Sequence, residues 1–317
     1  MNDWEREATM ELVRGLHNVD RAARGCVLTI GAFDGIHRGH QEMIRVLRTI
    51  AATHSLPAAL LSFEPTPREF FARATPPARL TRFREKYAAL DHYGVQRFVC
   101  LRFDSALRSM SADEFISQVL VDALGARHIV VGHDFKFGRN MAGSVETLRA
   151  AGLAAGFAVT EVPPFEIDGE RVSSSLIRAA LEAGDIAHAT RLLGRPYRMT
   201  GRVVEGAKLG RKLGFPTANL RPQRRATPLA GVFAVRVSGG GLQNAPGVAS
   251  LGTRPAVNGK ALLLEAHVFD FDGDLYRRYL HVDFIARLRD ELWFPDMDGL
   301  VEQMKQDAAR AREILSR

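Results

Sequence analysis

Two histidines three residues apart offer the clearest chemistry in this sequence. His37 and His40 lie in the segment GAFDGIHRGH (residues 31–40), which follows the apolar run VLTI (27–30). This order predicts a β-strand, a glycine turn and then a helix. The N–H groups and the dipole at a helix start attract phosphate, and glycines let a ligand approach the backbone. The turn is therefore predicted to hold a reacting polyphosphate, although histidines also occur as plain helix caps.

Two later segments favour the same kind of ligand. The loop GHDFKFG (132–138) follows a strand-like run, and VSSSLIR (172–178) brings hydroxyl groups and an arginine to a helix start, which suits phosphate. Taken alone, the first is more typical of a turn that packs two phenylalanines, and the second of a plain N-cap. All three segments in this order, each where a strand gives way to a helix or loop, indicate nucleotide chemistry.

The second half has a glycine-rich, basic segment, GRVVEGAKLGRKLGFPTAN (201–219). Its backbone N–H groups can form an anion nest, and Thr217 and Asn219 offer neutral oxygens that suit Mg²⁺. Nothing in this half has the spacing of a Walker A motif. Taken alone, the segment is more typical of a connection between barrel strands.

Glu265 lies within an apolar, strand-like segment at 262–269. A carboxylate is costly to bury among apolar residues, so Glu265 is either a general base in a crevice or an outward-facing acid at an alternating position. The run DFDGD (270–274) lacks the rest of the EF-hand spacing, and Asp-Gly between two strands predicts a hairpin turn.

Short apolar strands and helices alternate in the first half. The predicted strands are 26–30, 58–63, 97–102, 128–131 and 157–162. The predicted helices are 41–53, 81–92, 112–124 (with a capping box at 111–114), 144–155, 174–183 and 185–193. This order predicts a doubly wound, Rossmann-like α/β domain over residues 1–193. Its ligand crevice would lie at the carboxyl ends of the strands, where the histidine turn is placed.

The pattern changes after a linker at 194–196. Strand-like segments separated by turn residues follow at 197–204, 231–237, 246–251, 262–269 and 279–286, and a helix is predicted at 299–315. Residues 194–317 are therefore predicted to form an antiparallel β-barrel with a terminal helix.

The composition of the 317 residues is that of a globular protein, with 46% hydrophobic and 25% charged residues. No apolar run approaches the roughly 20 residues that span a bilayer, and the mixed charges at the N-terminus do not suggest a secretion signal. The net charge of +7 suits phosphate ligands, and no basic run interleaved with aromatic residues indicates nucleic acid. Cys26 and Cys100 predict buried free thiols in a reducing cytoplasm.

The three segments of the first half closely resemble the signatures of the HxGH nucleotidyltransferases, and among them the FMN adenylyltransferase module of prokaryotic FAD synthetases. A GxFDGxHxGH turn, a GxDFxFG loop and an ISSTxIR segment are matched at 31–40, 132–138 and 172–178, with Val172 and Ser175 as small departures. The resemblance implies that the 5′-phosphate of FMN attacks the α-phosphorus of ATP here.

This resemblance also implies residue roles. His37, His40 and Arg178 would act on the triphosphate as catalytic residues, and Phe63 and Glu64 would bind the flavin. The implied nucleotide-binding residues are Gly31, Phe33, Asp34, Gly35, Gly39, Gly132, Asp134, Ser173 and Ser174.

The second half resembles the riboflavin kinase barrel. The signature GxxxGxxLGFPTAN is matched at 206–219, GTRPxxxG at 252–259 and LExHxxDFDGDLY at 264–276. By this resemblance, Glu265 is the general base for the 5′-hydroxyl of riboflavin, and Thr217 and Asn219 bind Mg²⁺. The remaining implied contacts are Gly206, Lys208, Gly210 and Gly214 for the nucleotide and Arg289 for the flavin.

Together these resemblances imply the prokaryotic bifunctional riboflavin kinase/FMN adenylyltransferase family. The expected ligands are Mg²⁺, ATP, riboflavin, FMN and FAD, with no nucleic-acid or membrane partner and at most a weak homo-oligomer. One alternative is a nucleotidyltransferase with another phosphorylated acceptor, against which the kinase-like barrel argues. The other is a nucleotide- or RNA-binding protein without catalysis, against which the presence of every candidate catalytic residue argues.

Overall fold

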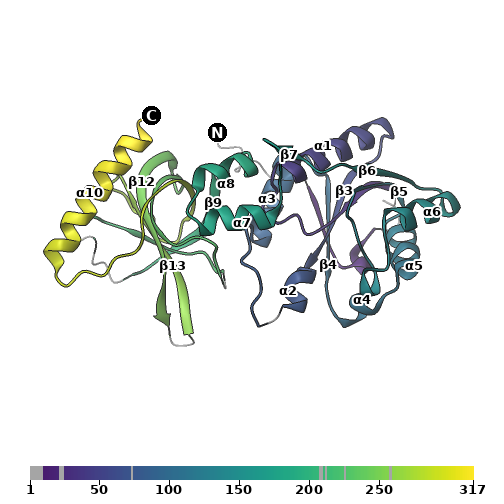
Figure 1. The fold of residues 1–317 in the computed structure, drawn as a ribbon, viewed down its shortest axis with the longest axis horizontal. Helices are drawn as coiled ribbons and strands as arrows, with labels where there is room; N and C mark the ends of the chain where they lie inside the picture. Colours follow the sequence, from purple (N-terminus) through teal and green to yellow (C-terminus); the bar gives the residue numbers. More distant parts are fainter. Residues whose placement is uncertain are drawn as a thin grey trace. The chain divides into compact units, whose positions relative to one another are not determined.

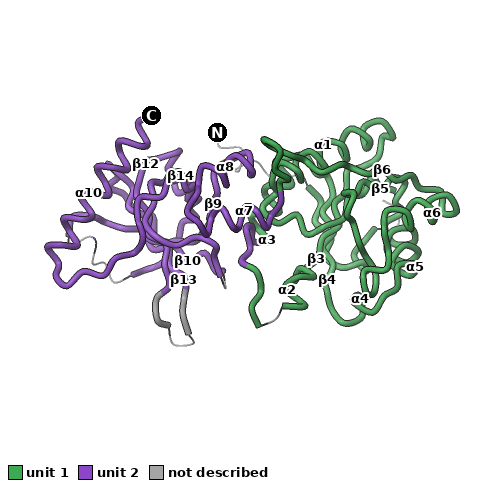
Figure 2. Tube along the Cα trace, in the orientation of Figure 1, with its two compact units in different colours: residues 1–77, 83–172 green, residues 78–82, 173–317 purple. Residues whose placement is uncertain are grey.

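The computed structural model describes residues 10–20, 25–72, 74–206, 210, 213–224, 226–256 and 259–317. The chain divides into two compact units, which have different colours in Figure 2: residues 1–77 with 83–172, and residues 78–82 with 173–317. Residues 173–193 therefore belong to the second compact unit. The predicted boundary between the functional domains, at 193/194, stays a prediction.

The first unit is built on a six-stranded sheet in the order β1-β4-β3-β2-β5-β6, and all its strand pairs are parallel. The predicted doubly wound architecture is thus confirmed. The strands are β1 (Glu11–Arg14), β2 (Cys26–Ile30), β3 (Ala58–Glu64), β4 (Arg97–Arg102), β5 (Ala126–Gly132) and β6 (Ala158–Val162). The edge strand β1 was not predicted, because Val13 is its one buried residue.

Helices cover both faces of this sheet (Figure 1). They are α1 (Arg38–Thr53), α2 (Pro67–Phe71), α3 (Phe83–His92), α4 (Ser105–Ser109), α5 (Ala112–Glu114), the π-helical η2 (Phe115–Ala123) and α6 (Val145–Ala155). Short 3₁₀ turns η1 (Leu16–Asn18) and η3 (Arg139–Met141) and a small hairpin of β7 (Glu166–Ile167) and β8 (Glu170–Arg171) complete the unit.

Burial on both faces explains why the strand sequences are almost wholly apolar. Val27 of β2 packs on Leu47 of α1. The next residue, Leu28, packs on the opposite side with Val119 of η2 and Leu148 of α6. The sheet is therefore held rigidly between two helical layers, and the loops at the carboxyl ends of its strands have a fixed base.

The second unit begins with α7 (Ser174–Glu182) and α8 (Ile186–Leu193) and continues as a closed barrel in the order β10-β13-β12-β11-β14-β9. All its strand pairs are antiparallel, as predicted. The strands are β9 (Tyr197–Val204), β10 (Ala218–Arg221), β11 (Gly231–Gly239), β12 (Leu242–Ala256), β13 (Gly259–Val268) and β14 (Tyr279–Arg289). The run DFDGD turns as predicted, but it joins β13 to β14, which are not neighbours, so the predicted hairpin is wrong.

Helix α10 (Met297–Leu315) packs against the outside of the barrel (Figure 1). Its Ala311 and Leu315 form a buried cluster with Val232 and Leu288 of the barrel wall. Within the described ranges, no helix is long and apolar enough to cross a membrane. Cys26 and Cys100 are buried free thiols, as predicted.

Two candidate active sites

The histidine turn lies at the carboxyl end of the central strand β2. Strand β2 ends at Ile30, and the N–H of Gly31 donates to the carbonyl oxygen of Leu61 on β3 at 3.0 Å. Helix α1 then begins at Arg38 with His37 as its N-cap, and the N–H of His40 donates to Nδ1 of His37 at 3.3 Å. Because Nδ1 accepts this bond, the proton of a neutral His37 ring lies on Nε2, where it can be donated to a ligand.

The two imidazole rings form a compact pair. Their centroids are 3.7 Å apart with an angle of 16° between the planes, and the ring of Phe33 lies 4.6 Å from that of His40. Burial lowers the pKa of His40 well below its usual value, and the neighbouring His37 and Lys86 lower it further. His40 is therefore a neutral imidazole in the free protein, which makes it a weak base and a good hydrogen-bonding group.

The backbone of the turn is held in an unusual conformation. Phe33 has φ of 48° and Ile36 has φ of 43°, values in the left-handed region that bulky residues rarely adopt. Both side chains are buried in the core next to α3, so packing maintains the strain, as is common at functional sites. Phe33, predicted to contact the nucleotide, thus lies under the histidines; its contact with a nucleotide stays a prediction.

Sequence reasoning missed Lys86, which lies directly beneath this turn. Its Nζ donates to the carbonyl oxygen of Ala32 at 2.5 Å, and the residue is 4% exposed. A signal was present in the sequence: Lys86 shares one helix face with Ala89 and Leu90 at spacings of three and four, and both of these are buried.

The loop at 132–138 forms one wall of a cavity of about 450 Å³ in the first unit. Phe135 and Phe137 of this loop are stacked with centroids 5.4 Å apart, and Phe63 of β3 lines the cavity as well. The other named residue of the loop, Asp134, is exposed and paired with Arg171 at 2.6 Å, which lowers the pKa of Asp134.

The cavity combines aromatic walls with positive charge. Phe71 and Phe103 line it together with Arg108, Lys136 and Arg139. The guanidinium of Arg108 lies 5.4 Å from the centre of the Phe71 ring, in the range of a cation–π contact. Such a site suits a flat aromatic ligand that carries negative charge.

The third predicted segment passes from the first unit, at Val172, into the second. Ser173 is the N-cap of α7, and its hydroxyl accepts from the N–H of Leu176 at 3.2 Å. Ser174 is the first residue of the helix. Arg178 donates from Nε to the carbonyl oxygen of Ala78 at 2.6 Å. The nucleotide roles of Ser173, Ser174 and Arg178 stay predictions.

A row of polar residues crosses the outer surface of the barrel. Glu265 of β13 pairs with Asn219 of β10 on one side and with Ser250 of β12 on the other. The flanking Leu264 and Ala266 are buried in the barrel, whereas Glu265 is half-buried. Glu265 therefore faces outward at an alternating position, next to the predicted metal ligand Asn219.

Two glycines leave room for the predicted metal ligands. A Cβ on Gly206 would lie 2.6 Å from Cγ of Asn219, and a Cβ on Gly210 would lie 3.3 Å from the hydroxyl of Thr217. Thr217 also lines a cavity of about 700 Å³ together with Asp272 and Asp274. The amide and hydroxyl groups thus lie against Gly206 and Gly210, and their oxygens are of the kind that suits a hard cation.

Lys208 and Gly214 are two further predicted nucleotide contacts of the barrel. Lys208 lies outside the described residues, and Gly214 has φ of 83° in the turn before β10. Among the described residues, no three His, Cys, Asp or Glu side chains gather as a metal site.

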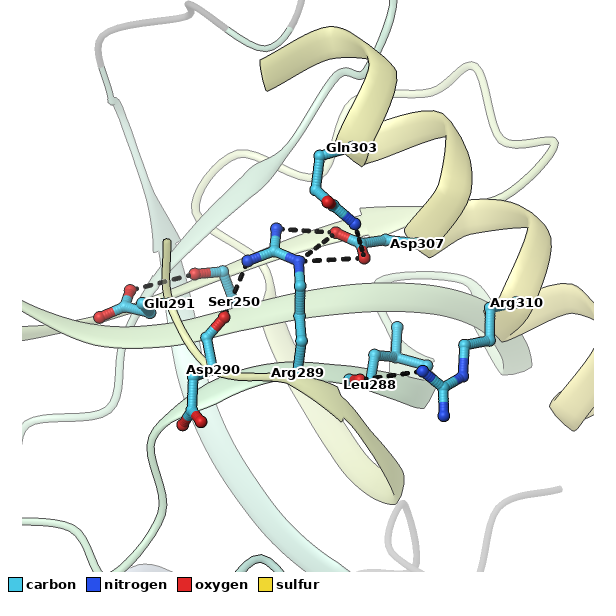
Figure 3. A network of polar contacts seen from close by, with 8 residues as sticks. All are labelled: Ser250, Leu288, Arg289, Asp290, Glu291, Gln303, Asp307 and Arg310. Carbon is cyan, nitrogen blue, oxygen red and sulfur yellow. Dashed lines mark hydrogen bonds and ion pairs between the residues drawn. The ribbon is translucent and has the colours of Figure 1, made fainter. Parts of the chain in front are cut away.

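Arg289, predicted to bind the flavin, is held by α10 (Figure 3). Its guanidinium forms bonds of 2.8–3.1 Å with the carboxylate of Asp307, which is buried and also bonded to Gln303. Its Nη1 donates to the carbonyl oxygen of Asp290 at 2.8 Å. The side chain of the next residue, Glu291, reaches toward Ser250 in the polar row, with 3.5 Å between the oxygens.

Comparison with known proteins supports the division into two functional parts. Residues 19–176 match the FAD synthetase family and residues 193–315 match the riboflavin kinase family. A bifunctional riboflavin kinase/FMN adenylyltransferase from Pseudomonas fluorescens is 49% identical over 96% of this chain and 98% of its own length. The enzyme of the same description from Escherichia coli K12 is 44% identical over 96% and 98%.

The chain belongs to the bifunctional riboflavin kinase/FMN adenylyltransferase family. A crystal structure from Streptococcus pneumoniae, described as a macrolide-efflux protein, is similar over 96% of this chain and 99% of that one, with a TM-score of 0.82 and 31% identity. Over the residues that the structure describes, the chain has both folds that its family signatures predict: a parallel α/β sheet and a closed β-barrel.

We expect His40 to remain neutral where an ordinary histidine, with a pKa near 6.5, takes up a proton. Burial and two neighbouring groups disfavour its charged form. Nitrogen-15 NMR of the histidine side chains, with His40→Gln for assignment, should show no protonation of this ring between about pH 8 and pH 6. A ring that titrates near 6.5 would contradict the geometry described for the turn.

We expect Gly206→Ala to impair riboflavin phosphorylation, because the added Cβ displaces the side chain of Asn219. A loss of about 10- to 100-fold is typical when a ligand-orienting group is disturbed. Asn219→Ala should lose a similar amount, and the double variant should lose little more. FMN adenylylation by the same protein is the control and should stay unchanged. Fully additive losses would show that Gly206 acts independently of Asn219.

Proposed function

We propose that the two reactions of this family take place at separate sites in this chain. With ATP as the donor, the enzyme phosphorylates riboflavin to FMN at the barrel and releases ADP. In the α/β part it adenylylates FMN to FAD and releases pyrophosphate. The observation that supports this best is the placement of the two residue sets: the histidine turn and the aromatic cavity lie in the first unit, and the Asn219–Glu265 row in the second.

Adenylyl transfer needs positioning more than it needs a base. A phosphate dianion is already nucleophilic, so the site must align it with the α-phosphorus of ATP and stabilise the charge on the triphosphate. The Nε2–H of His37 and the first N–H groups of α1 are donors suited to this task. A neutral His40 adds a hydrogen-bonding group without removing a proton from the nucleophile. Arg178 and Ser174 remain predicted contacts of the triphosphate.

The aromatic cavity is proposed to hold the isoalloxazine ring of FMN. Phe63, Phe135 and Phe137 offer faces for a flat ring. Ile30, the last residue of β2 before the histidine turn, also lines the cavity. A flavin bound here can direct its phosphate toward the turn. We therefore assign the 132–138 loop mainly to the flavin rather than to the adenosine, and Glu64, next to Phe63, stays a predicted flavin contact.

Riboflavin phosphorylation has a different requirement, because a hydroxyl is a poor nucleophile until its proton is accepted. Glu265 is proposed to accept it from the 5′-hydroxyl, which then attacks the γ-phosphorus of ATP. Thr217 and Asn219 would hold Mg²⁺, which supplies charge neutralisation on the phosphates when bound. Arg289, anchored by Asp307, would contact the flavin from the β14–α10 connection.

We further propose that residues 1–193 and 194–317 are the functional domains and that the enzyme acts in the cytoplasm. The buried thiols of Cys26 and Cys100 support the second point, because free cysteines persist in a reducing compartment. Small molecules are the proposed partners, and any self-association is expected to be weak.

Substitutions at the two sites should separate the reactions. His40→Ala should stop FAD formation while FMN accumulates from riboflavin and MgATP. Glu265→Gln should slow FMN formation by about 100-fold or more, the lower range for a general base, while added FMN is still converted to FAD. Chromatography of the flavins gives both readouts from one reaction. If either folded variant lost both activities, the two sites would not be independent.

Phe63→Ala should weaken FMN binding in the adenylylation reaction. Loss of one aromatic face from the cavity is expected to raise the KM for FMN about tenfold, corresponding to about 1.4 kcal/mol, with little change in the KM for ATP. Leu153→Ala is a suitable control in the same unit, because Leu153 is 91% exposed. An equal increase in both KM values would place Phe63 outside a flavin-specific site.

A further inference from the structure

Lys86 is a buried cation that the described chemistry does not yet use. It lies on α3, and its Nζ is 2.5 Å from the carbonyl oxygen of Ala32 and 3.5 Å from the hydroxyl of Ser62 on β3. Burying an ammonium group is unfavourable unless the protein surrounds it with acceptors. A lysine in this place therefore calls for an account of what its charge and its hydrogen bonds do.

We propose that Lys86 is a positioning residue for adenylyl transfer. It fixes the backbone of the histidine turn and places an ammonium group beneath the site where the triphosphate is proposed to react. This inference rests on the proposed function of the turn, and it assigns a role to a residue outside the three signature segments.

The first argument concerns the backbone. Two donors converge on the carbonyl oxygen of Ala32: Nζ of Lys86, and the hydroxyl of Ser62 at 3.4 Å. This carbonyl belongs to the peptide that links Ala32 to Phe33, the residue with φ of 48°. Fixing the peptide plane therefore fixes the start of the left-handed turn, which would otherwise relax toward an unstrained conformation. The position of His37, four residues later, depends on this conformation.

The second argument concerns charge. The groups that act on the ring of His40 are His37 in the same turn and Lys86 from α3, and both oppose its protonation. Burial is the largest cause of the lowered pKa of His40, and the cation below the turn lowers it further. The same charge attracts the phosphates to the mouth of the turn, because electrostatic effects are strong in a partly desolvated site.

The test compares Lys86→Met, which removes the charge and the hydrogen bond, with Lys86→Gln, which removes the charge but keeps an N–H donor on a slightly shorter side chain. In the full chain, Lys86→Met should lower kcat for FMN adenylylation by about 100-fold, as expected when reacting groups are misplaced. Lys86→Gln should lose less. In both variants the pKa of His40, followed by NMR, should rise. Lys305→Met, on an exposed lysine of α10, is the matched control.

Two further measurements distinguish positioning from a general loss of structure. Binding of FMN, followed by quenching of flavin fluorescence, reports on the cavity in the same unit and should be unchanged. Riboflavin kinase activity should also be unchanged. Unaltered adenylylation and an unaltered His40 titration in Lys86→Met and Lys86→Gln would overturn the proposal, as would loss of FMN binding in both variants. Failure of the proposed function is distinct, since the unsubstituted chain would then form no FAD from FMN and ATP.

Discussion

The bond from the N–H of His40 to Nδ1 of His37 determines much of the first unit's chemistry. The imidazole cap starts α1 within a few residues of the end of the buried strand β2. It also brings the rings of His37 and His40 together as a stacked pair. The cap also decides which nitrogen of a neutral His37 ring carries the proton. It depends on a turn whose left-handed residues, Phe33 and Ile36, are held by burial rather than by glycine. The packed sheet below is what makes this possible, because a flexible base would let the turn relax.

The barrel positions its polar row by a different rule. In a strand, successive side chains point to opposite faces, so a buried Leu264 and Ala266 force Glu265 outward, next to Asn219 on one neighbour and Ser250 on the other. Gly206 and Gly210, before β10, lie close to the amide of Asn219 and the hydroxyl of Thr217. Interior packing therefore determines which residues form the outer row. The two interpretations of Glu265, an outward-facing acid and a general base, are compatible, because an outward-facing carboxylate can be reached by a substrate.

The strands of the parallel sheet could be predicted because burial on both faces makes them short apolar runs. The barrel strands could be predicted because buried and exposed residues alternate along them. Strands β2, β4 and β9 have the predicted bounds. Strand β10 was missed because it has four residues and lies inside a segment dominated by glycine and basic residues. The helix over 112–124 was predicted, but not its π-helical form, in which the N–H of Leu124 reaches the carbonyl oxygen of Val119. Such a widened turn has no marked periodic signature.

The candidate site residues show the same limit. Sequence signatures placed His37, His40, Asn219 and Glu265 where chemistry is possible, because these residues lie at element ends or on one strand face. Lys86 lies outside the signature segments. Its helix face indicates burial, but its contact with a turn 54 residues earlier cannot be predicted from local sequence.

The two ionisable groups proposed to act in the two reactions, His40 and Glu265, lie in different surroundings. Around His40, burial and two neighbouring groups suppress charge, which weakens the imidazole as a base but leaves it able to form hydrogen bonds. That environment is suited to a reaction whose nucleophile is already an anion. Glu265 is half-buried and faces outward, with Asn219 and Ser250 as its partners on the adjacent strands. The general base proposed for riboflavin phosphorylation must be reached by the substrate hydroxyl, and an outward-facing position on the barrel allows this. In the proposed scheme, each fold thus places its ionisable group as its own reaction requires.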